Sequence, residues 1–430
     1  MSDHRTSAAR EPASAAVGAG PTGPLLTREG HPPEGGSFQP QTETETDTQA
    51  QARGRRAQGA HRRRLVTQAA APLMETAVIL PARDEEAGVL LALESLAAQS
   101  APPDLIVVVV NNSSDRTEEF ARDFADRPGV PRTVVFNLPD NPHKKAGALN
   151  HGIGWLHRAP GGLAATVKYL LVMDADTSLH PKFLERARNV MASDRRVGGL
   201  SATCLGRTGL WKNLWQRYLL GMQIMEYGRY ARGRYRFGIH SMSGAGSFYR
   251  TEALLSILRW RGEVFWEDHA NLVEDYETTL ALKEAGWKVT ANQHCIAYTD
   301  LMPTLRELIG QRERWGRGTV DTLRRRGWTK HTWFSITSMV LGFAGFLYTL
   351  GWLAAWTGVV ADSGFVLDPV WLGLVAFWVL YAAFRTRHLG WKGVLIDVLM
   401  LPGLVFSSVR AYWFVSSVVK SYATRVSAWK

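Results

Sequence analysis

Short apolar runs alternate with amphipathic stretches through the middle of the chain. Four runs are apolar almost throughout, which favours strands that are covered on both faces of a sheet. These runs are residues 76–81, 104–110, 132–139 and 169–173. The first intervening stretch has helical spacing, and its predicted buried side consists of Leu90, Leu91, Leu93 and Leu96. The alternation predicts an α/β domain over residues 71–330.

Two longer apolar runs follow this domain. Residues 333–361 contain no charged side chain, and residues 369–384 form a second run. About 20 apolar residues suffice to cross a bilayer, so we expect a transmembrane helical hairpin over residues 331–386. Its link carries Asp362 and Asp368, whereas basic residues flank the pair. The positive-inside rule then predicts a multi-pass protein of the cell membrane with its α/β domain in the cytoplasm.

The last apolar stretch, residues 394–419, contains Asp397, Pro402 and Arg410. These residues favour a kinked helix at the cytoplasmic interface, and a third crossing is the alternative. Residues 387–430 are therefore expected to form an interfacial or third membrane helix with a basic tail. The buried core of a soluble domain is the competing interpretation for all of the C-terminal apolar runs.

The beginning of the chain has a different composition. Residues 1–70 are rich in small and polar residues, carry several arginines and contain almost no large apolar side chains. This composition predicts a disordered basic tail. It contains no apolar core of the kind that a secretory signal needs, so we expect no such signal.

The formal charge of +11 makes a nucleic-acid partner worth considering. However, basic residues beside an apolar span more often face anionic lipid, and no nucleic-acid-binding signature accompanies them. We therefore expect membrane lipid and no nucleic acid as a partner. Cys204 and Cys295 are the only cysteines. They are too few for a metal-binding set and fit a reducing compartment.

Polar pairs follow three of the four predicted strands. The pairs are Asp84 with Glu85, Asn111 with Asn112, and Asp174 with Asp176. Ligands of open parallel sheets bind beyond the carboxyl ends of the strands, so these side chains are expected at one site. Asp174 and Asp176 are one residue apart, and two such carboxylates repel unless a divalent cation lies between them. Alternatively, one aspartate caps the next helix while the other faces solvent.

Seven motifs occur in one order along the chain. They are ILPARDEE, VVVVNNSSDRT, KKAGALN, VMDADT, GAGSFYR, VEDYETTLAL and QRERW. In this order they resemble the family 2 inverting glycosyltransferases, which have a GT-A (Rossmann-like) fold. QRERW resembles the processive membrane branch, which includes chitin, hyaluronan, cellulose and poly-N-acetylglucosamine synthases. The resemblance covers about residues 76–330 and implies a membrane segment after them.

The resemblance implies a nucleotide-sugar donor at the strand ends. It places Asp174 near the nucleotide and a Mg²⁺ or Mn²⁺ ion, and it makes Asp176 a ligand of that ion. It gives Lys145 a contact with the donor, whereas a solvated lysine is the alternative. Asn111 stands where the family usually has an aspartate for uracil, and its amide oxygen can accept the same hydrogen bond. Three further residues are expected to line the donor pocket: Ala82, Asp84 and Glu85.

Inversion at the sugar requires a base that takes the proton of the acceptor hydroxyl. The resemblance assigns this role to Asp275, with Glu274 beside it. Both fall in the first turn of a predicted helix that begins near Glu274 and ends at Gly286. The alternative is that the acids of this turn only complement the helix dipole, which is the role we expect for Glu277.

The QRERW segment falls on another predicted helix. Gln311, Arg314 and Trp315 have the spacing that puts them on one helix face. A cationic group there suits the diphosphate, and the indole suits a sugar ring of the acceptor. Arg312 is included in this set. The alternative is a basic juxtamembrane helix anchored by its tryptophan.

The small-residue loop at Gly246 and Ser247 suits close approach of an acceptor sugar. Together, these features predict a membrane-bound enzyme that transfers a sugar, with N-acetylglucosamine as first candidate, from a UDP-sugar to a growing β-linked polysaccharide. The runner-up is transfer of a single sugar to a lipid or glycan acceptor. A third hypothesis, a catalytically dead scaffold, conflicts with the retention of Asp174, Asp176 and Asp275. No export partner can be identified from the sequence.

Overall fold

The computed structural model describes residues 74–207, 216, 219–228, 239–267, 272–363, 369–386, 391, 394–395 and 401–423. The chain divides into two units, residues 1–68 and 69–430. The predicted disordered tail over residues 1–70 lies outside the described residues, so the following account concerns the second unit.

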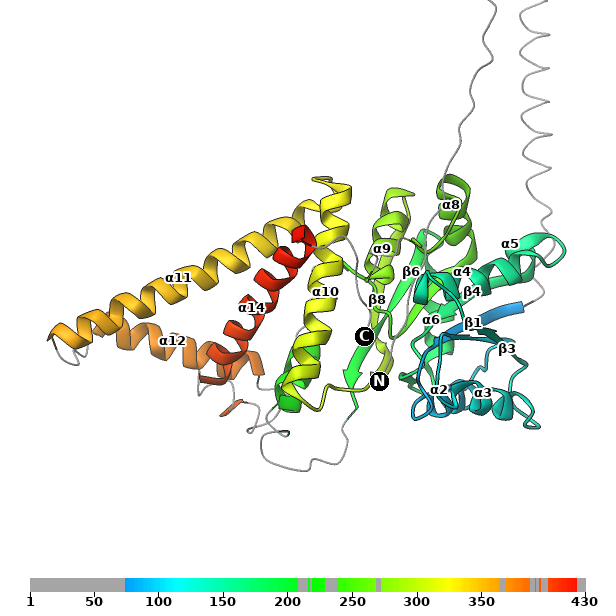
Figure 1. The fold of residues 1–430 in the computed structure, drawn as a ribbon, viewed down its shortest axis with the longest axis horizontal. Helices are drawn as coiled ribbons and strands as arrows, with labels where there is room; N and C mark the ends of the chain where they lie inside the picture. Colours follow the sequence, from blue (N-terminus) through cyan, green and yellow to red (C-terminus); the bar gives the residue numbers. More distant parts are fainter. Residues whose placement is uncertain are drawn as a thin grey trace, which may run out of the picture. The chain divides into compact units, whose positions relative to one another are not determined.

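Four parallel strands form one part of a single sheet (Figure 1). They are β1 (Met74–Ala82), β2 (Leu105–Asn111), β3 (Thr133–Leu138) and β4 (Val167–Val172). β1 lies between β2 and β4, and β3 pairs with the outer side of β2. Alternate side chains of β1 enter two different cores, with Val78 and Leu80 in one and Ala77 and Ile79 in the other. The predicted burial of both strand faces is confirmed for β1, β2 and β4 but is wrong for β3, whose side chains are only half-buried or exposed because it pairs on one side only.

Four further strands complete the sheet in the order β3-β2-β1-β4-β7-β6-β8-β5. They are β5 (Ser178–Leu179), β6 (Val197–Gly206), β7 (Ser247–Arg250) and β8 (Lys288–Thr299). β7 runs antiparallel to both β4 and β6, so the sheet is mixed. Ser247 of β7 pairs with Val172 of β4. This pairing brings the loop that precedes β7 next to Asp174.

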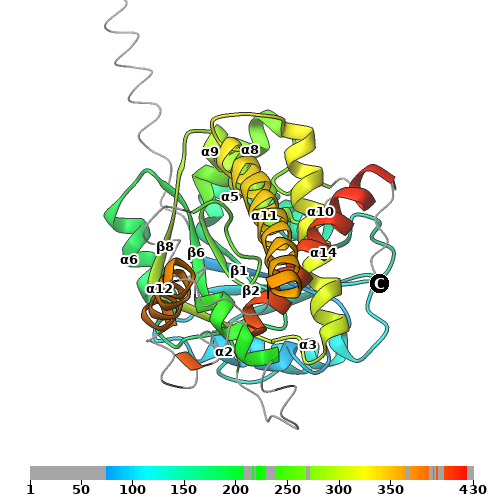
Figure 2. The ribbon, with the colours of Figure 1, turned by 90° about the vertical axis from the view of Figure 1, so that its left-hand side faces the viewer.

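Helices cover both faces of the sheet (Figure 2). One face packs against α2 (Val89–Ala97), α3 (Thr117–Ala125) and α6 (Phe183–Ser193). The other packs against α4 (Lys144–His157), α5 (Gly162–Thr166), α8 (Thr251–Arg261) and α9 (Glu274–Glu284). The prediction that Leu91 is buried is wrong, because the side chain is 42% exposed. The buried stripe of α2 instead follows Val89, Ala92, Leu93 and Leu96, the i, i+3, i+4, i+7 spacing of one helix face.

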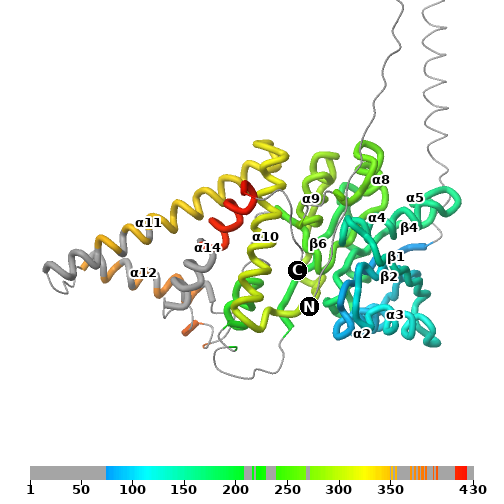
Figure 3. The backbone as a smooth tube through the Cα atoms, in the orientation of Figure 1, coloured from blue at the N-terminus to red at the C-terminus, as the bar shows by residue number. Residues whose placement is uncertain are grey.

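Four helices follow the sheet, and their path can be followed in Figure 3. They are α10 (Leu305–Arg326), α11 (Trp333–Ser363), α12 (Pro369–Thr386) and α14 (Leu401–Ala423). α14 packs along α10. Lys420 forms a 2.6 Å ion pair with Glu313, and the Ser417 hydroxyl donates to the Glu313 carbonyl at 3.2 Å. The helices approach closely at Gly316, where an added Cβ would lie 2.5 Å from Ser417 Oγ.

The membrane predictions for the C-terminal helices are not confirmed. Within the described ranges, no helix is both long and apolar enough to span a bilayer, including those of the hairpin expected over residues 331–386. The interfacial helix expected over residues 394–419 overlaps α14. One side of α14 is buried, with Ser417 0% and Ser421 4% exposed.

Candidate active site

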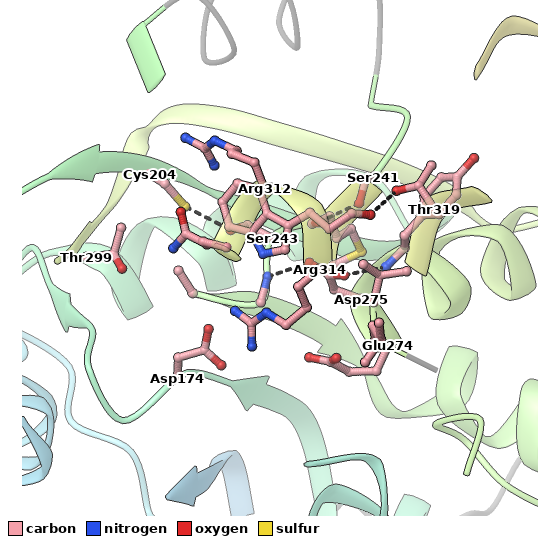
Figure 4. Close-up of a pocket in the computed structure, with 18 of the residues that line it drawn as sticks. Asp174, Cys204, Ser241, Ser243, Glu274, Asp275, Thr299, Arg312, Arg314 and Thr319 are labelled. Carbon is pink, nitrogen blue, oxygen red and sulfur yellow. Dashed lines mark hydrogen bonds between the residues drawn. The ribbon is translucent and has the colours of Figure 1, made fainter. Parts of the chain in front are cut away.

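A cavity of about 770 Å³ lies beyond the carboxyl ends of β1, β2 and β4 (Figure 4). Two walls of different chemistry enclose it. We call one the charged wall; it consists of Glu85, Lys145, Asp174, Asp176, Glu274 and Asp275. We call the other the aromatic wall; it consists of Tyr227, Trp315, Phe334, Met339, Trp413 and Phe414.

Most of the residues selected from the sequence line this cavity. They are Ala82, Glu85, Asn111, Lys145, Asp174, Asp176, Glu274, Asp275, Gln311, Arg312, Arg314 and Trp315. Three selected residues do not line it, namely Asp84, Gly246 and Ser247. The structure therefore gathers the strand-end, α9 and α10 residues around one space, as the motif order predicts.

Asp84 links two neighbouring loops. Its Oδ1 accepts a 2.8 Å hydrogen bond from the Ser114 N–H, and its own N–H donates to Ser113 Oγ at 3.1 Å. Its backbone is left-handed, with φ of 52°. The carboxylate is thus engaged with the loop after β2 and lies outside the cavity wall.

Gly246 and Ser247 lie behind the cavity wall. The Ser247 hydroxyl donates to the Ser243 carbonyl at 2.8 Å. Gly246 sits so close to β6 that an added Cβ would lie 3.0 Å from the Ala202 side chain. These two residues support the loop that carries Gly244 and do not face the cavity.

Asp174 and Asp176 follow β4 directly, and a turn rather than an extended chain connects them. The Thr177 N–H donates to the Asp174 carbonyl at 3.2 Å, which closes this turn. Burial and the charge of Asp174 raise the pKa of Asp176 to about 6. Burial, Asp176 and Asp174 raise the pKa of Glu85 to about 8. Carboxylates are therefore crowded at this end of the charged wall.

This crowding fits a divalent cation. Asp174 and Asp176 offer oxygen atoms only, which suits Mg²⁺ or Mn²⁺. In the part of the chain that the structure describes, no group of three or more histidine, cysteine, aspartate or glutamate side chains is placed to hold a metal. Mg²⁺ in phosphate-transfer sites is commonly held by one or two carboxylates, while substrate oxygens complete its shell. The two aspartates match that pattern.

Lys145 joins the two ends of the charged wall. Its Nζ lies 2.5 Å from Asp174 Oδ1 and also forms an ion pair with Glu274. Burial alone would lower the pKa of Lys145, but Asp174 and Glu274 raise it above its usual range. Lys145 is therefore a fixed positive charge inside the cavity, and the alternative of a solvated lysine does not describe it.

Asp275 stands in the first turn of α9. Its Oδ2 accepts a 2.9 Å hydrogen bond from the Gly244 N–H. An added Cβ on Gly244 would lie 3.1 Å from Lys145 Nζ, 3.2 Å from Asp174 Oδ2 and 3.6 Å from Asp275 Oδ2. Both carboxylates thus approach one small-residue position. Burial and the neighbouring Glu274 raise the pKa of Asp275 to about 6, which is suitable for a general base near neutral pH.

Glu277 does more than complement the dipole of α9. It is 3% exposed and forms ion pairs with Arg261 at 3.3 Å and with Arg326. Arg326 also pairs with Glu284 of the same helix. Because Arg326 ends α10, this cluster fixes the end of α10 against α9.

The cavity face of α10 agrees with the spacing prediction. Gln311, Arg314 and Trp315 all line the cavity. The helix begins with a capping box between Thr304 and Glu307, which sets where this face starts. Arg314 extends toward the side of the cavity where Asp174 and Glu274 lie (Figure 4).

The sequence interpretation missed most of the aromatic wall. Phe334 and Met339 come from α11, and Trp413 and Phe414 come from α14. Their apolar runs were interpreted as membrane segments, so nothing in the local pattern assigned them to the cavity. Tyr227 lies in a stretch rich in aromatics and arginines, a composition that does not separate packing from ligand contact.

Two cellulose synthases are similar to the chain in sequence. A UDP-forming cellulose synthase of Dictyostelium discoideum is 26% identical over 192 residues, which are 44% of this chain and 17% of that protein. The UDP-forming cellulose synthase 1 of Komagataeibacter xylinus is 27% identical over 212 residues, 49% of this chain and 26% of that protein. Both proteins are named as catalytic subunits. The chain thus spans about a quarter or less of the length of these relatives.

The fold is shared with a solved enzyme, the mannosyltransferase PcManGT from Pyrobaculum calidifontis in complex with GDP-Man and Mn²⁺. The two are 18% identical with a TM-score of 0.54, and the match covers 81% of this chain and 87% of that one. This likeness confirms the predicted α/β GT-A-like fold. Residues 72–318 match the family described as Glycosyltransferase like family 2. The chain belongs to this family and is a glycosyltransferase.

Proposed function

We propose that this enzyme transfers a sugar from a UDP-sugar to a growing β-linked glycan with inversion at the anomeric carbon. UDP-glucose and UDP-N-acetylglucosamine are the first donors to test. The similarity to two cellulose synthases whose names include "UDP-forming" supports the nucleotide. Asn111 at the end of β2 lines the cavity and can accept a hydrogen bond from uracil.

One observation carries the proposal: Asp275 and Asp174 line the same cavity, and an added Cβ on Gly244 would lie within 3.6 Å of a carboxylate oxygen of each. In our proposal the donor diphosphate lies on the Asp174 side and the acceptor hydroxyl reaches Asp275. Asp275 Oδ takes the hydroxyl proton as the acceptor oxygen attacks the anomeric carbon. The raised pKa of this carboxyl makes it a stronger base than an exposed aspartate. The hydrogen bond from Gly244 holds it in place.

The positive groups of the cavity suit the leaving diphosphate. Lys145 is held in the charged wall by two ion pairs, and Arg314 extends toward the same side. Both can stabilise negative charge that develops on the diphosphate as the sugar leaves. A Mg²⁺ or Mn²⁺ ion held by Asp174 and Asp176 would supply further charge neutralisation there. The Mn²⁺ in the name of the PcManGT structure supports that choice of ion.

The aromatic wall suits the acceptor. Sugar rings present C–H faces that pack well on indole and phenyl rings. Trp315 is only one turn of α10 from Gln311, so a stacked ring and a hydrogen-bonding amide are available together. We propose that the terminal sugar of the acceptor stacks on Trp315.

UDP release from a panel of UDP-sugars, with Mn²⁺ and short β-linked saccharides present, tests this function. We expect release from at least one donor in the parent and its near-complete loss in Asp275→Asn. A parent that releases UDP from none of the donors contradicts the proposal. An Asp275→Asn variant that matches the parent contradicts the assignment of the base.

Transfer of a single sugar to a lipid or glycan acceptor is the second candidate. The matches to cellulose synthases cover less than half of this chain and a small part of each relative. They therefore support the transfer domain more than a polymerising apparatus. Product length separates the two candidates, because single transfer adds one sugar to a labelled acceptor, whereas polymerisation gives a ladder.

We further propose that α11 and α12 contact the lipids of the cell membrane and that the sheet domain faces the cytoplasm. Large apolar side chains are exposed on both helices, which is typical of surfaces that contact lipid or protein. Examples are Leu341 at 64%, Tyr348 at 75%, Phe377 at 65% and Leu380 at 69%. Flotation with phosphatidylglycerol-containing vesicles tests this proposal. We expect the parent to float, and Phe377→Glu combined with Leu380→Glu to float less.

A further inference from the structure

A buried ion pair holds the aromatic residue on which the proposed acceptor stacks. Arg312 is 5% exposed, and its Nη2 donates to Glu226 Oε2 at 2.6 Å. Its guanidinium carbon lies 4.3 Å from the centroid of the Trp315 ring and 5.8 Å from that of Tyr227. Glu226, Arg312 and Trp315 therefore form one contiguous unit, and the planar guanidinium restricts the orientation of the indole.

Arg312 has a carboxylate partner close to it. Its charge is balanced by Glu226 within the cavity wall. Figure 4 shows the guanidinium groups of Arg312 and Arg314 pointing in different directions, with Arg314 toward Asp174 and Glu274. A charge that is already paired attracts a diphosphate weakly, but it still donates hydrogen bonds. Arg312 is therefore not placed to serve the diphosphate.

Polar atoms of this unit lack partners although they are buried. Among the residues that the structure describes, Arg312 Nε and Nη1 and Gln311 Oε1 have no hydrogen-bond partner. Both residues line the cavity. Buried polar atoms normally have a partner. These atoms have almost no exposed surface, so a ligand in the cavity does not reach them, and Arg312 acts through its contacts with Glu226 and Trp315.

We propose that Glu226 is a positioning residue for the acceptor: through Arg312 it fixes the indole of Trp315, on which the terminal sugar of the acceptor stacks. This inference rests on the proposed function, because it assigns the acceptor to the aromatic wall. It separates the two arginines of the QRERW segment, with Arg314 serving the diphosphate and Arg312 serving the acceptor.

The test is a kinetic comparison of the parent with Glu226→Gln, which keeps the size of the side chain and removes its charge. UDP release is measured while cellotetraose or tetra-N-acetylchitotetraose is varied and, separately, while the donor is varied. We expect the acceptor KM to rise about tenfold, since a charge-assisted hydrogen bond is replaced by a weaker one. The donor KM and the UDP release without acceptor should stay within about twofold of the parent, because no donor contact changes.

Two further variants keep the test decisive. Glu226→Asp retains the charge and should have an intermediate acceptor KM. Glu118→Gln removes a carboxylate of a surface ion pair with Arg122 and should match the parent. In addition, the double variant Glu226→Gln with Arg312→Gln should be no worse than Arg312→Gln alone, because the two residues act as one unit.

An unchanged acceptor KM in Glu226→Gln overturns the inference. So does a parallel loss of acceptor-independent UDP release, because that result indicates general damage to the fold. A parent that hydrolyses a donor but extends neither tetrasaccharide also overturns it. Failure of the proposed function has a different signature, namely a parent that releases no UDP from any donor.

Discussion

The charged wall and the aromatic wall of the cavity are built in different ways. The charged wall comes from strand ends and from the first turns of α4 and α9, and each of its residues lies in a short motif. The aromatic wall is assembled from four separate segments, including α11 and α14 near the C-terminal end. Chemistry that acts on the donor is thus encoded locally, whereas the surface for the acceptor depends on how distant helices pack. Substitutions in the charged wall are therefore expected to affect different kinetic constants from substitutions in the aromatic wall.

Replacing the base should have the largest effect. We expect Asp275→Asn to lower the transfer rate by about 10³-fold or more, because the amide cannot take the proton of the acceptor hydroxyl. Donor affinity should be nearly unchanged. Single-turnover rates and donor binding, measured separately, check this expectation. Asp123→Asn, at an exposed position of α3, is the matched control. Equal loss in both variants would refute the role of Asp275.

Asp176→Asn should have the next largest effect. We expect a loss of about 10²-fold in kcat/KM, because a weakened cation site leaves charge on the diphosphate less well stabilised. The Mn²⁺ concentration that gives half-maximal activity should rise at the same time. A Mn²⁺ titration of the parent and the variant measures this shift. The idea fails when the variant is slower but has the same Mn²⁺ dependence.

Trp315→Ala tests the aromatic wall. We expect the acceptor KM to rise about tenfold, since the variant loses the stacked indole and its burial of the sugar face. The donor KM should change little, and Trp315→Phe should recover part of the loss. Kinetics with cellotetraose or tetra-N-acetylchitotetraose provide the measurement. A larger change in donor KM than in acceptor KM would assign Trp315 to the charged side instead.

The transfer activity should depend moderately on pH. Asp275 must be deprotonated to act as a base, so activity is lost as pH falls through its raised pKa of about 6. Between pH 7 and pH 5.5 this corresponds to a loss of about fourfold. A cation bound at Asp174 would shift the transition to slightly lower pH, because it stabilises the neighbouring carboxylate. The pH profile of kcat/KM is the measurement, and activity that increases from pH 7 to pH 5 contradicts it.

The smallest effect concerns stability. Gly316→Ala places a Cβ 2.5 Å from Ser417 Oγ, so either this hydroxyl rotates and gives up its hydrogen bond to the Glu313 carbonyl or α14 shifts away from α10. We expect a loss of about 1–2 kcal/mol and a lower Tm. Gly310→Ala on the same helix has no atom within 4 Å of the new Cβ and should gain up to about 1 kcal/mol. Thermal unfolding of both variants checks this contrast, and equal Tm values would show that the α10–α14 contact contributes little.

The four parallel strands and the charged wall could be predicted from the sequence, whereas β5, β6, β7 and β8 could not. Buried strands appear as uniform apolar runs, and Asp174 follows β4 as its pattern indicates. The prediction was wrong for Leu91, which is exposed. The residue at which α2 begins determines which of its side chains face the sheet, and a shift of that residue by one position turns a different set of side chains toward the sheet. Asp84 stands in a family motif, yet its left-handed backbone directs the carboxylate to Ser114.

The aromatic wall shows the limit of local patterns. Trp413 lies in an apolar run that fits a membrane segment as well as a packed helix. Only its tertiary neighbours place it at the cavity. Glu226 was not selected either, because its partner Arg312 is 86 residues away in the chain. Long-range pairs of this kind have no signature in a single sequence.

The antiparallel insertion of β7 between β4 and β6 has a consequence for biosynthesis. Asp174 leaves the ribosome about a hundred residues before Asp275, and the two meet only when the strand carrying Ser247 has docked. A nascent chain can therefore acquire its nucleotide-facing half well before it can consume any sugar. We therefore expect sugar transfer to begin only after β7 has joined the sheet.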